Sequence, residues 1–309
     1  MSNQPNKSFR TRSFDFGSFF FTGVTGLATF LILGILAVIL LNILFNGAPG
    51  VSWHFVSAGT QKDMFDLKQA GVFPMIFGTT ARVILMTIVV VPVGVITAVY
   101  LTEYAHANSI FTRGIRGAVN NLAGVPSIVF GLFGAGFFIH FIGRDLLNSR
   151  NWGQPTLLWA SLTLSVMTLP VVIVTTEESL KAIPAGLREA SLALGATKLQ
   201  TVVKIVLPQA LPGILTGGIL AVSRAAGEVA PILFTGVAYY MASLPGSLHD
   251  QFMDLGYHIF VLSTQSPNVD KTKPILYATV LVLLMLTFAL NLVAILVRAR
   301  VRRKLRTLQ

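Results

Sequence analysis

The sequence contains no cysteine and few charged residues. Among its 309 residues there is no Cys, and only 11% are Asp, Glu, Lys or Arg. The first absence excludes disulfides and thiolate metal sites, and it removes the redox chemistry from which a cellular compartment could be read. The second absence excludes an ordinary soluble domain, in which about 25% of the residues are charged.

Acidic residues are scarcer than basic ones. There are 12 Asp and Glu against 23 Lys and Arg, which gives a formal net charge of +11. Such a charge would suit a nucleic-acid partner, but the basic residues gather at the ends of apolar runs and near the C-terminus. This distribution is typical of membrane proteins, in which it matches anionic lipid and the positive-inside rule. We therefore expect contact with membrane lipid and no nucleic-acid partner.

Long apolar runs are the abundant feature of the chain. Hydrophobic residues make up 53% of it, and the mean hydropathy is +0.73. A run of about 20 apolar residues is long enough to cross a bilayer as a helix. The sequence predicts an all-α, polytopic integral membrane protein with about six transmembrane helices, which we place at 19–46, 76–104, 120–142, 155–176, 209–236 and 274–297.

The polar segments between these runs predict the domain organisation. Of the 23 Lys and Arg, 15 fall in segments on one side of the membrane and six on the other, so we expect both termini in the cytoplasm. The predicted parts are a cytoplasmic tail (1–18), a peripheral first helix (19–46), an extracytoplasmic loop (47–72), a transmembrane domain (73–297) containing a cytoplasmic element (183–208), and a basic cytoplasmic tail (298–309).

Four charged residues fall within the apolar runs. Arg82 and Glu103 lie near the ends of their run, where we expect them to reach the interface. Arg224 and Glu228 lie deeper, where each charge costs roughly 2.5–3.5 kcal/mol, and their i, i+4 spacing predicts one helix face. Two interpretations stay open. The two side chains form a structural pair that joins two spans, or Arg224 offers its guanidinium to a passing oxyanion while Glu228 orients it.

The 183–208 element is the only long amphipathic stretch. Pro184 favours the first turn of a short helix, which Gly195 would end in a left-handed conformation. Thr197 and Gln200 predict a capping box that opens a second helix, and Pro208 predicts a break before the next span, together with Pro212. We expect Arg188 and Glu189 to face outward and the apolar faces to be buried, namely Leu187, Ala190, Ser191 and Leu194 on the first helix and Leu199, Val202, Val203 and Val206 on the second.

A spaced motif runs through this element. Glu189-Ala190-Ser191, three residues, Gly195, nine residues, Ile205, one residue and Leu207-Pro208 resembles the E-A-A, G, I-x-L-P loop of the permease subunits of ABC importers. Only Ser191 departs from that pattern. Four further stretches resemble phosphate importer permeases of the PstA type, namely 124–129, 177–178, 192–197 and 227–231. The resemblance covers roughly residues 71–297 and leaves the first span outside the transporter core.

The resemblance implies a type I ABC importer permease fold in the cell (inner) membrane, working by alternating access. Its partners would be a homologous permease subunit in a heterodimer, two copies of a cytoplasmic ABC ATPase, and an extracytoplasmic phosphate-binding protein. The chain has no G-x-x-x-x-G-K-[ST] phosphate loop, so ATP hydrolysis would belong to the partner, and we expect no enzymatic activity, cofactor or metal site in this chain.

The resemblance assigns the coupling residues, whereas the substrate pathway is predicted from the polar residues within the apolar runs. The residues expected to couple to the ATPase are Glu189, Ala190, Ser191, Gly195, Ile205, Leu207 and Pro208. Arg224, Glu228 and Ser127 are expected on the substrate pathway, although small-residue packing is the other interpretation of Ser127. The alternatives are a permease for another oxyanion, an ion-coupled secondary transporter or channel, and a non-conducting assembly or signalling subunit.

Overall fold

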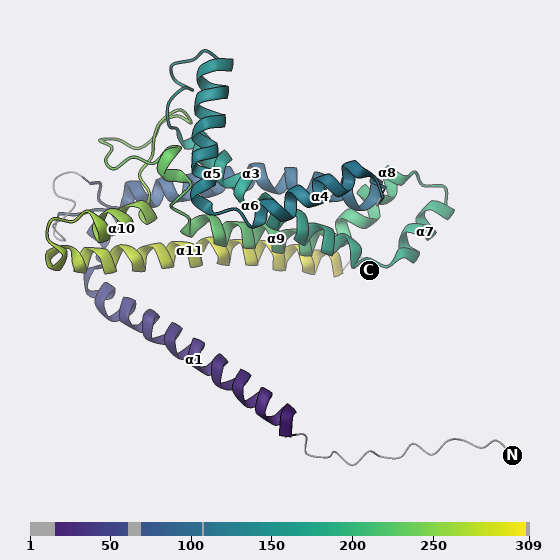
Figure 1. Cartoon of the computed structure of the whole chain (residues 1–309), viewed down its shortest axis with the longest axis horizontal. Helices are drawn as coiled ribbons and strands as arrows, with labels where there is room; N and C mark the ends of the chain where they lie inside the picture. The colour runs from purple at the N-terminus through teal and green to yellow at the C-terminus, as the bar shows by residue number, and fades with distance from the viewer. Residues whose placement is uncertain (1–15, 61–68, 107, 307–309) are drawn as a thin grey trace.

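The computed structural model describes residues 16–60, 69–106 and 108–306, and helices dominate these ranges (Figure 1). Most of the predicted 1–18 tail and part of the 47–72 loop lie outside the described residues. Six helices are long and apolar enough to cross a membrane, and they cover 19–50, 73–104, 127–146, 157–181, 198–227 and 269–304. The chain is therefore an all-α, polytopic membrane protein, as predicted.

Four long helices run side by side along the long axis of the molecule (Figure 1). They are α3 (Phe73–Val99), α6 (Leu157–Lys181), α9 (Leu207–Gly227) and α11 (Val269–Arg306). Helix α6 is the most buried of the candidate spans, although it carries several Ser and Thr residues. The hydroxyls of Ser161, Thr163, Ser165 and Thr168 donate to carbonyls one turn earlier, so they enter the core without unpaired polar atoms.

Glycines let α9 approach α6 closely. Gly213 and Gly217 are one helical turn apart on α9, and a Cβ at either position would collide with the hydroxyl of Ser179 or Thr175 on α6. Small residues one turn apart are a common device for packing transmembrane helices. The contact between α6 and α9 therefore depends on the absence of two side chains.

Replacing Gly217 by Ala is expected to lower stability by about 1–3 kcal/mol, the usual cost of overpacking a close-packed core. The neighbouring Gly218→Ala variant is the matched control, because a Cβ there meets only a methyl of Val91 at an ordinary distance of 3.4 Å. Thermal unfolding of both variants in detergent checks the prediction. Equal melting temperatures for the two variants would contradict it.

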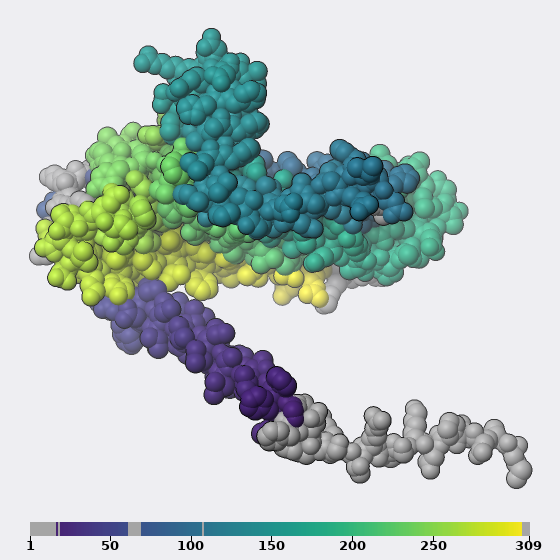
Figure 2. All heavy atoms as spheres, viewed as in Figure 1, coloured from purple at the N-terminus to yellow at the C-terminus, as the bar shows by residue number. Residues whose placement is uncertain are grey.

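The third predicted span begins later than expected. The range 120–142 is divided between an amphipathic helix, α4 (Ile110–Ala123), and a continuous helix made of α5 (Ser127–Gly134) and the π-helical η3 (Ala135–Leu146). Pro126 disfavours the helical conformation at the preceding residue and so separates the two helices. Figures 1 and 2 show the helix formed by α5 and η3 standing crosswise to the four long helices.

Helix α1 (Phe16–Gly47) projects from the rest of the molecule as a separate arm (Figure 2). It is anchored near its end, where Gly47 packs against Tyr277 and Leu281 of α11. Its large apolar side chains from Phe19 to Phe45 are exposed, except for the half-buried Ile43. A helix that is apolar on every side needs an apolar surrounding, which the lipid bilayer provides.

Two regions near the C-terminus differ from the prediction. A short apolar helix, α10 (Leu255–Thr264), lies between the predicted fifth and sixth spans, and the short η5 (Ile232–Phe234) lies within the predicted fifth span, whose long helix ends at Gly227 instead of 236. Helix α10 packs on α11 and α3. Helix α11 itself continues to Arg306, so the basic residues of the predicted tail are on its last turns.

Helix α10 buries a titratable side chain, His258. Burial lowers the pKa of His258 from its ordinary 6.5 to about 4. The folded state favours the neutral ring of His258. The contribution of this side chain to the free energy of unfolding is therefore complete above pH 6.5 and is lost as the pH falls towards 4. Each pH unit in this window is expected to cost about 1.4 kcal/mol. Melting temperatures at pH 7.5 and pH 5.5, compared with those of His258→Leu, check this, and an equal pH dependence in both proteins would contradict it.

Candidate functional site

A buried ion pair connects three helices close to the end of α9. Arg82 of α3 is 0% exposed, and its Nε lies 2.7 Å from Oδ2 of Asp254, the residue that precedes α10. Its Nη1 donates to the carbonyl of Ala225 at 2.7 Å and its Nη2 to that of Ala226 at 3.2 Å, both in the last turn of α9. The prediction that Arg82 reaches the interface is wrong, because the protein itself supplies its acceptors.

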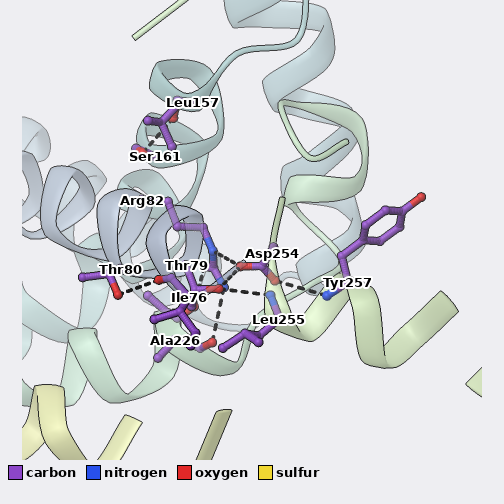
Figure 3. A network of polar contacts seen from close by, with 11 residues as sticks. Ile76, Thr79, Thr80, Arg82, Leu157, Ser161, Ala226, Asp254, Leu255 and Tyr257 are labelled. Atoms are coloured by element: carbon purple, nitrogen blue, oxygen red, sulfur yellow. Dashed lines mark hydrogen bonds and ion pairs between the residues drawn. The ribbon is translucent and has the colours of Figure 1, made fainter. Parts of the chain in front are cut away.

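Asp254 has a full set of hydrogen-bond partners (Figure 3). Besides Arg82, its Oδ2 accepts the hydroxyl of Thr79 at 2.8 Å, and its Oδ1 caps α10 by accepting the amide of Tyr257 at 3.1 Å. The Thr79 hydroxyl also accepts the amide of Leu255. The network is neutral overall and fixes the end of α9 relative to α3 and α10.

Arg224 and Glu228 flank the end of α9 that Arg82 holds through the carbonyls of Ala225 and Ala226. Arg224 is in the last turn of α9, and Glu228 is the first residue after the helix, with an extended backbone. Arg224 Nε and Glu228 Oε1 are 3.6 Å apart, and the two side chains are 39% and 24% exposed. The pair therefore does not join two spans of this chain, because both members belong to the end of one helix. The guanidinium of Arg224 remains accessible to a ligand.

Ser127 is the first residue of α5, with Pro126 before it. Helix α5 packs through Gly131 on the carbonyls of Ala230 and Pro231, which follow Glu228. Within the described residues, Ser127 makes no hydrogen bond or ion pair with Arg224 or Glu228. The structure thus brings α5 to the segment after α9 without placing the serine hydroxyl on the ion pair.

The 183–208 element folds locally as predicted. Helix α7 (Ala185–Ala193) follows Pro184, and Gly195 has a φ of 85°, in the left-handed region. Thr197 and Gln200 form the capping box that opens α8 (Lys198–Thr201). The two helices lie at one end of the long bundle, the end at which α11 finishes (Figure 1).

The expected break at Pro208 and Pro212 does not occur. Helix α8 continues through the π-helical η4 (Val202–Val206) directly into α9, and Pro208 lies in the first turn of α9. A π-helical turn shifts the backbone hydrogen-bond pattern by one residue. The helix can therefore continue past Pro208 although this residue has no amide to donate. The element is therefore continuous with the helix that carries Arg224.

The apolar faces of the 183–208 element are only partly buried. Ser191, Val202 and Val206 are buried as expected, but Leu194 is 89% exposed. The other exposed apolar side chains are Leu187, Leu192, Leu199 and Val203. Glu189 faces outward as predicted, whereas Arg188 turns inward to Glu103. Glu103 is therefore also part of a contact within the protein and not an interfacial anchor.

The motif residues divide into an outward and an inward set. Glu189, Ala190 and Gly195 are exposed, whereas Ser191 is buried with its Oγ 2.9 Å from Oγ1 of Thr201 on α8. The remaining members, Ile205, Leu207 and Pro208, are half-buried. The hydroxyl of Ser191, at the position where the motif departs from E-A-A, thus connects α7 to α8.

The sequence matches a known family over most of its length. Residues 90–307 match the family described as binding-protein-dependent transport system inner membrane component. The chain belongs to this family. This permease is 35% identical over 214 residues to the probable ABC transporter permease protein YqgI of Bacillus subtilis (strain 168), covering 69% of this chain and 68% of the relative.

Other relatives of the permease are named for phosphate transport. It is 34% identical over 228 residues to phosphate transport system permease protein PstA 1 of Mycobacterium tuberculosis (strain ATCC 25618 / H37Rv), covering 74% and 70% of the two chains. It is 41% identical over 163 residues to PstA of Mycobacterium leprae (strain TN), covering 53% and 50%.

Solved structures show the same fold at lower identity. A bacterial ABC transporter involved in the import of alginate aligns with a TM-score of 0.64 at 14% identity, covering 91% of this chain and 95% of that chain. The MetNI methionine ABC transporter aligns with a TM-score of 0.53 at 22% identity, covering 75% and 94%. The predicted ABC permease fold is confirmed.

Proposed function

We propose that this chain is one permease subunit of an ATP-driven importer of inorganic phosphate, and that it forms half of the translocation pathway. The observation that carries the proposal is the similarity, at 34–41% identity, to permeases named for phosphate transport. The exposed guanidinium of Arg224 at the end of a long apolar helix agrees with an anionic substrate.

The 183–208 element is proposed to dock on the ATPase. It presents a small apolar surface, made of Leu187, Leu192, Leu194, Leu199 and Val203, beside the exposed carboxylate of Glu189. A short helix with an exposed apolar face fits into a groove of a partner, and a carboxylate beside it selects a basic group there. Gly195 allows the sharp turn between the two short helices. Ile205, Leu207 and Pro208 lie where η4 continues into α9 and so connect the element to that helix.

The substrate pathway is proposed to pass the end of α9. Arg224 would offer two parallel N–H donors to one edge of an oxyanion, and Glu228 would hold the guanidinium in place between transport events. The 3.6 Å separation of the ion pair is longer than a hydrogen bond, so an anion could displace Glu228 at small cost. Ser127 would line the neighbouring surface of α5.

The remaining partners follow from the family. The permease would pair with a homologous permease subunit and two copies of a cytoplasmic ABC ATPase, and would receive phosphate from an extracytoplasmic binding protein. In the inner membrane, the 183–208 element and both termini would face the cytoplasm, where the ATPase is, and surrounding lipid would cover α1. Alternating access would result when ATP-driven closure of the ATPase pair moves the docked helices.

The proposal is tested by uptake of labelled phosphate into vesicles that hold the co-purified complex. Uptake is expected to require ATP, the ATPase and the binding protein, and to continue when an ionophore removes ion gradients. Uptake that persists without ATP but stops with the ionophore would favour a secondary transporter instead. Uptake of sulfate or molybdate without phosphate would assign another oxyanion.

Crosslinking tests the docking surface separately. The chain has no cysteine, so a single cysteine at Ala190 is the only thiol of this subunit. It is expected to crosslink to the ATPase and to react with thiol reagents from the cytoplasmic side only. Labelling from the outer side would contradict the proposed orientation.

A further inference from the structure

The 183–208 element is attached to the inner end of α3 by an ion pair. Arg188 of α7 donates from Nε and Nη2 to Oε1 of Glu103, at 3.1 and 2.8 Å. Glu103 belongs to η2 (Tyr100–Tyr104), the π-helical turn that extends α3. Two residues 85 positions apart in the sequence thus connect α7 to the turn that extends α3.

Arg188 also binds two backbone carbonyls. Its Nη1 donates to Ile183 and its Nη2 donates to Leu180, both at 2.8 Å. Leu180 is in the last turn of α6 and Ile183 is in the loop after it. One guanidinium therefore joins the end of α3, the end of α6 and the start of the 183–208 element, and a Lys amine could not reproduce this planar arrangement.

A second contact joins the same turn of α3 to the other helix of the element. Nζ of Lys198, the first residue of α8, lies 5.1 Å from the ring centroid of Tyr104. This distance is within the range of a cation–π interaction. Both short helices of the element are thus attached to η2, α7 through Glu103 and α8 through Tyr104.

The ion pair is shielded from water. The side chain of Glu103 is 9% exposed and that of Arg188 is 22% exposed. Exposed pairs contribute little because water competes for them, whereas removing one partner of a shielded pair is costly. The exposed apolar side chains of the element lie at positions other than Arg188, so the proposed docking surface does not include the ion pair.

We propose that Arg188 and Glu103 form the joint through which movement of the 183–208 element reaches α3. Arg188 is thus a positioning residue of transport, on the assumption that the element docks on an ATPase as proposed above. Glu103 and Arg82 are 21 residues apart on a continuous helix, roughly 30 Å. A shift at the joint therefore reaches the Arg82 network and the end of α9 that carries Arg224.

The test measures ATP hydrolysis and phosphate uptake in the same vesicles, with the full complex. Glu103→Gln and Arg188→Lys are each expected to lower the phosphate transported per ATP hydrolysed by about tenfold, within the usual range of coupling between sites. The double variant is expected to be no worse than Arg188→Lys, because Glu103→Gln removes only the ion pair that Arg188→Lys already disrupts. Asp270→Asn, which removes an exposed carboxylate at the start of α11, is the control and is expected to match the wild type.

Two outcomes would overturn the joint. One is an unchanged ratio of transport to hydrolysis in both single variants. The other is a parallel loss of hydrolysis, uptake and assembled complex, which would show that the pair only stabilises the fold. Effects of the two substitutions that add in the double variant would likewise contradict a single shared interaction.

Spin labels give a readout that does not depend on the transported anion. Ile96 of α3 and Leu292 of α11 are exposed, and the substitutions Ile96→Cys and Leu292→Cys provide the only thiols of this subunit for attaching the labels. ATP is expected to change the distance between the labels in the wild type, and Glu103→Gln is expected to abolish the change. If the distance change persists in Glu103→Gln, or is absent from the wild type, the joint is disproved. If ATP changes the distance between the labels in the wild type but the wild type takes up no phosphate, only the proposed substrate is refuted.

Discussion

Replacing Arg224 by Gln is expected to abolish phosphate uptake while the complex still assembles. The Arg224 side chain is 39% exposed, and its partner Glu228 lies at 3.6 Å, which is too long for a hydrogen bond, so the guanidinium can still bind an anion. Removing one charged partner of a close contact costs about 2–5 kcal/mol, so uptake should fall by at least 30-fold. The helix itself is expected to be retained, because Arg82 and not Arg224 ties its last turn to α3.

A further variant separates charge from geometry at this position. Arg224→Lys keeps the charge but loses the planar pair of donors, so its uptake is expected to lie between those of the wild type and Arg224→Gln. Arg300→Gln removes an exposed cation near the C-terminal end of α11 and serves as the control. The measurement is ATP-dependent uptake of labelled phosphate, normalised to the amount of co-purified complex. Normal uptake by Arg224→Gln would exclude this arginine from the pathway.

Local signals in the sequence predicted the parts of the site that local chemistry determines. The left-handed Gly195 and the Thr197 capping box depend on residues within one or two turns, and both are confirmed. The apolar runs predicted the six long helices for the same reason, since the length and hydropathy of a helix are properties of one segment. The spaced motif predicted the family, which the match over residues 90–307 confirms.

Long-range contacts could not be predicted in this way. Arg82 and Asp254 are 172 positions apart, and nothing in their local sequence indicates that they meet. The sequence alone suggested that Arg224 and Glu228 join two spans or bind an anion. In the structure Arg82 joins the spans α3 and α9 through the carbonyls of Ala225 and Ala226 and pairs with Asp254 before α10, which leaves Arg224 available. The inward turn of Arg188 towards Glu103 was missed for the same reason.

The failed expectation at Pro208 has a different origin. Proline usually interrupts a helix because it lacks an amide and clashes with the preceding turn. Here η4 changes the hydrogen-bond pattern immediately before it, so the helix continues from Lys198 to Gly227. The expectation that proline ends an α-helix does not take a π-helical turn into account. Because of this turn, the 183–208 element is continuous with the helix that carries Arg224.

Replacing Arg82 by Gln is expected to cause a large loss of stability. It would leave the carboxylate of Asp254 buried without its cation and would weaken the bonds to the carbonyls of Ala225 and Ala226. Breaking one side of a buried ion pair costs about 3–5 kcal/mol, because the remaining charge is uncompensated. Thermal unfolding in detergent, together with the yield of folded protein, measures the effect.

The double variant Arg82→Met/Asp254→Leu shows whether the loss comes from the unpaired charge. Removing both charges leaves no buried ion, so this variant is expected to recover a large part of the stability lost in Arg82→Gln. It does not restore the two bonds to the end of α9, nor the cap that Asp254 provides for α10. Stability recovered without uptake would therefore identify the network as the support that holds Arg224 in place. If Arg82→Gln unfolds at the wild-type temperature, the carboxylate of Asp254 finds water or another donor, and the network contributes little to the fold.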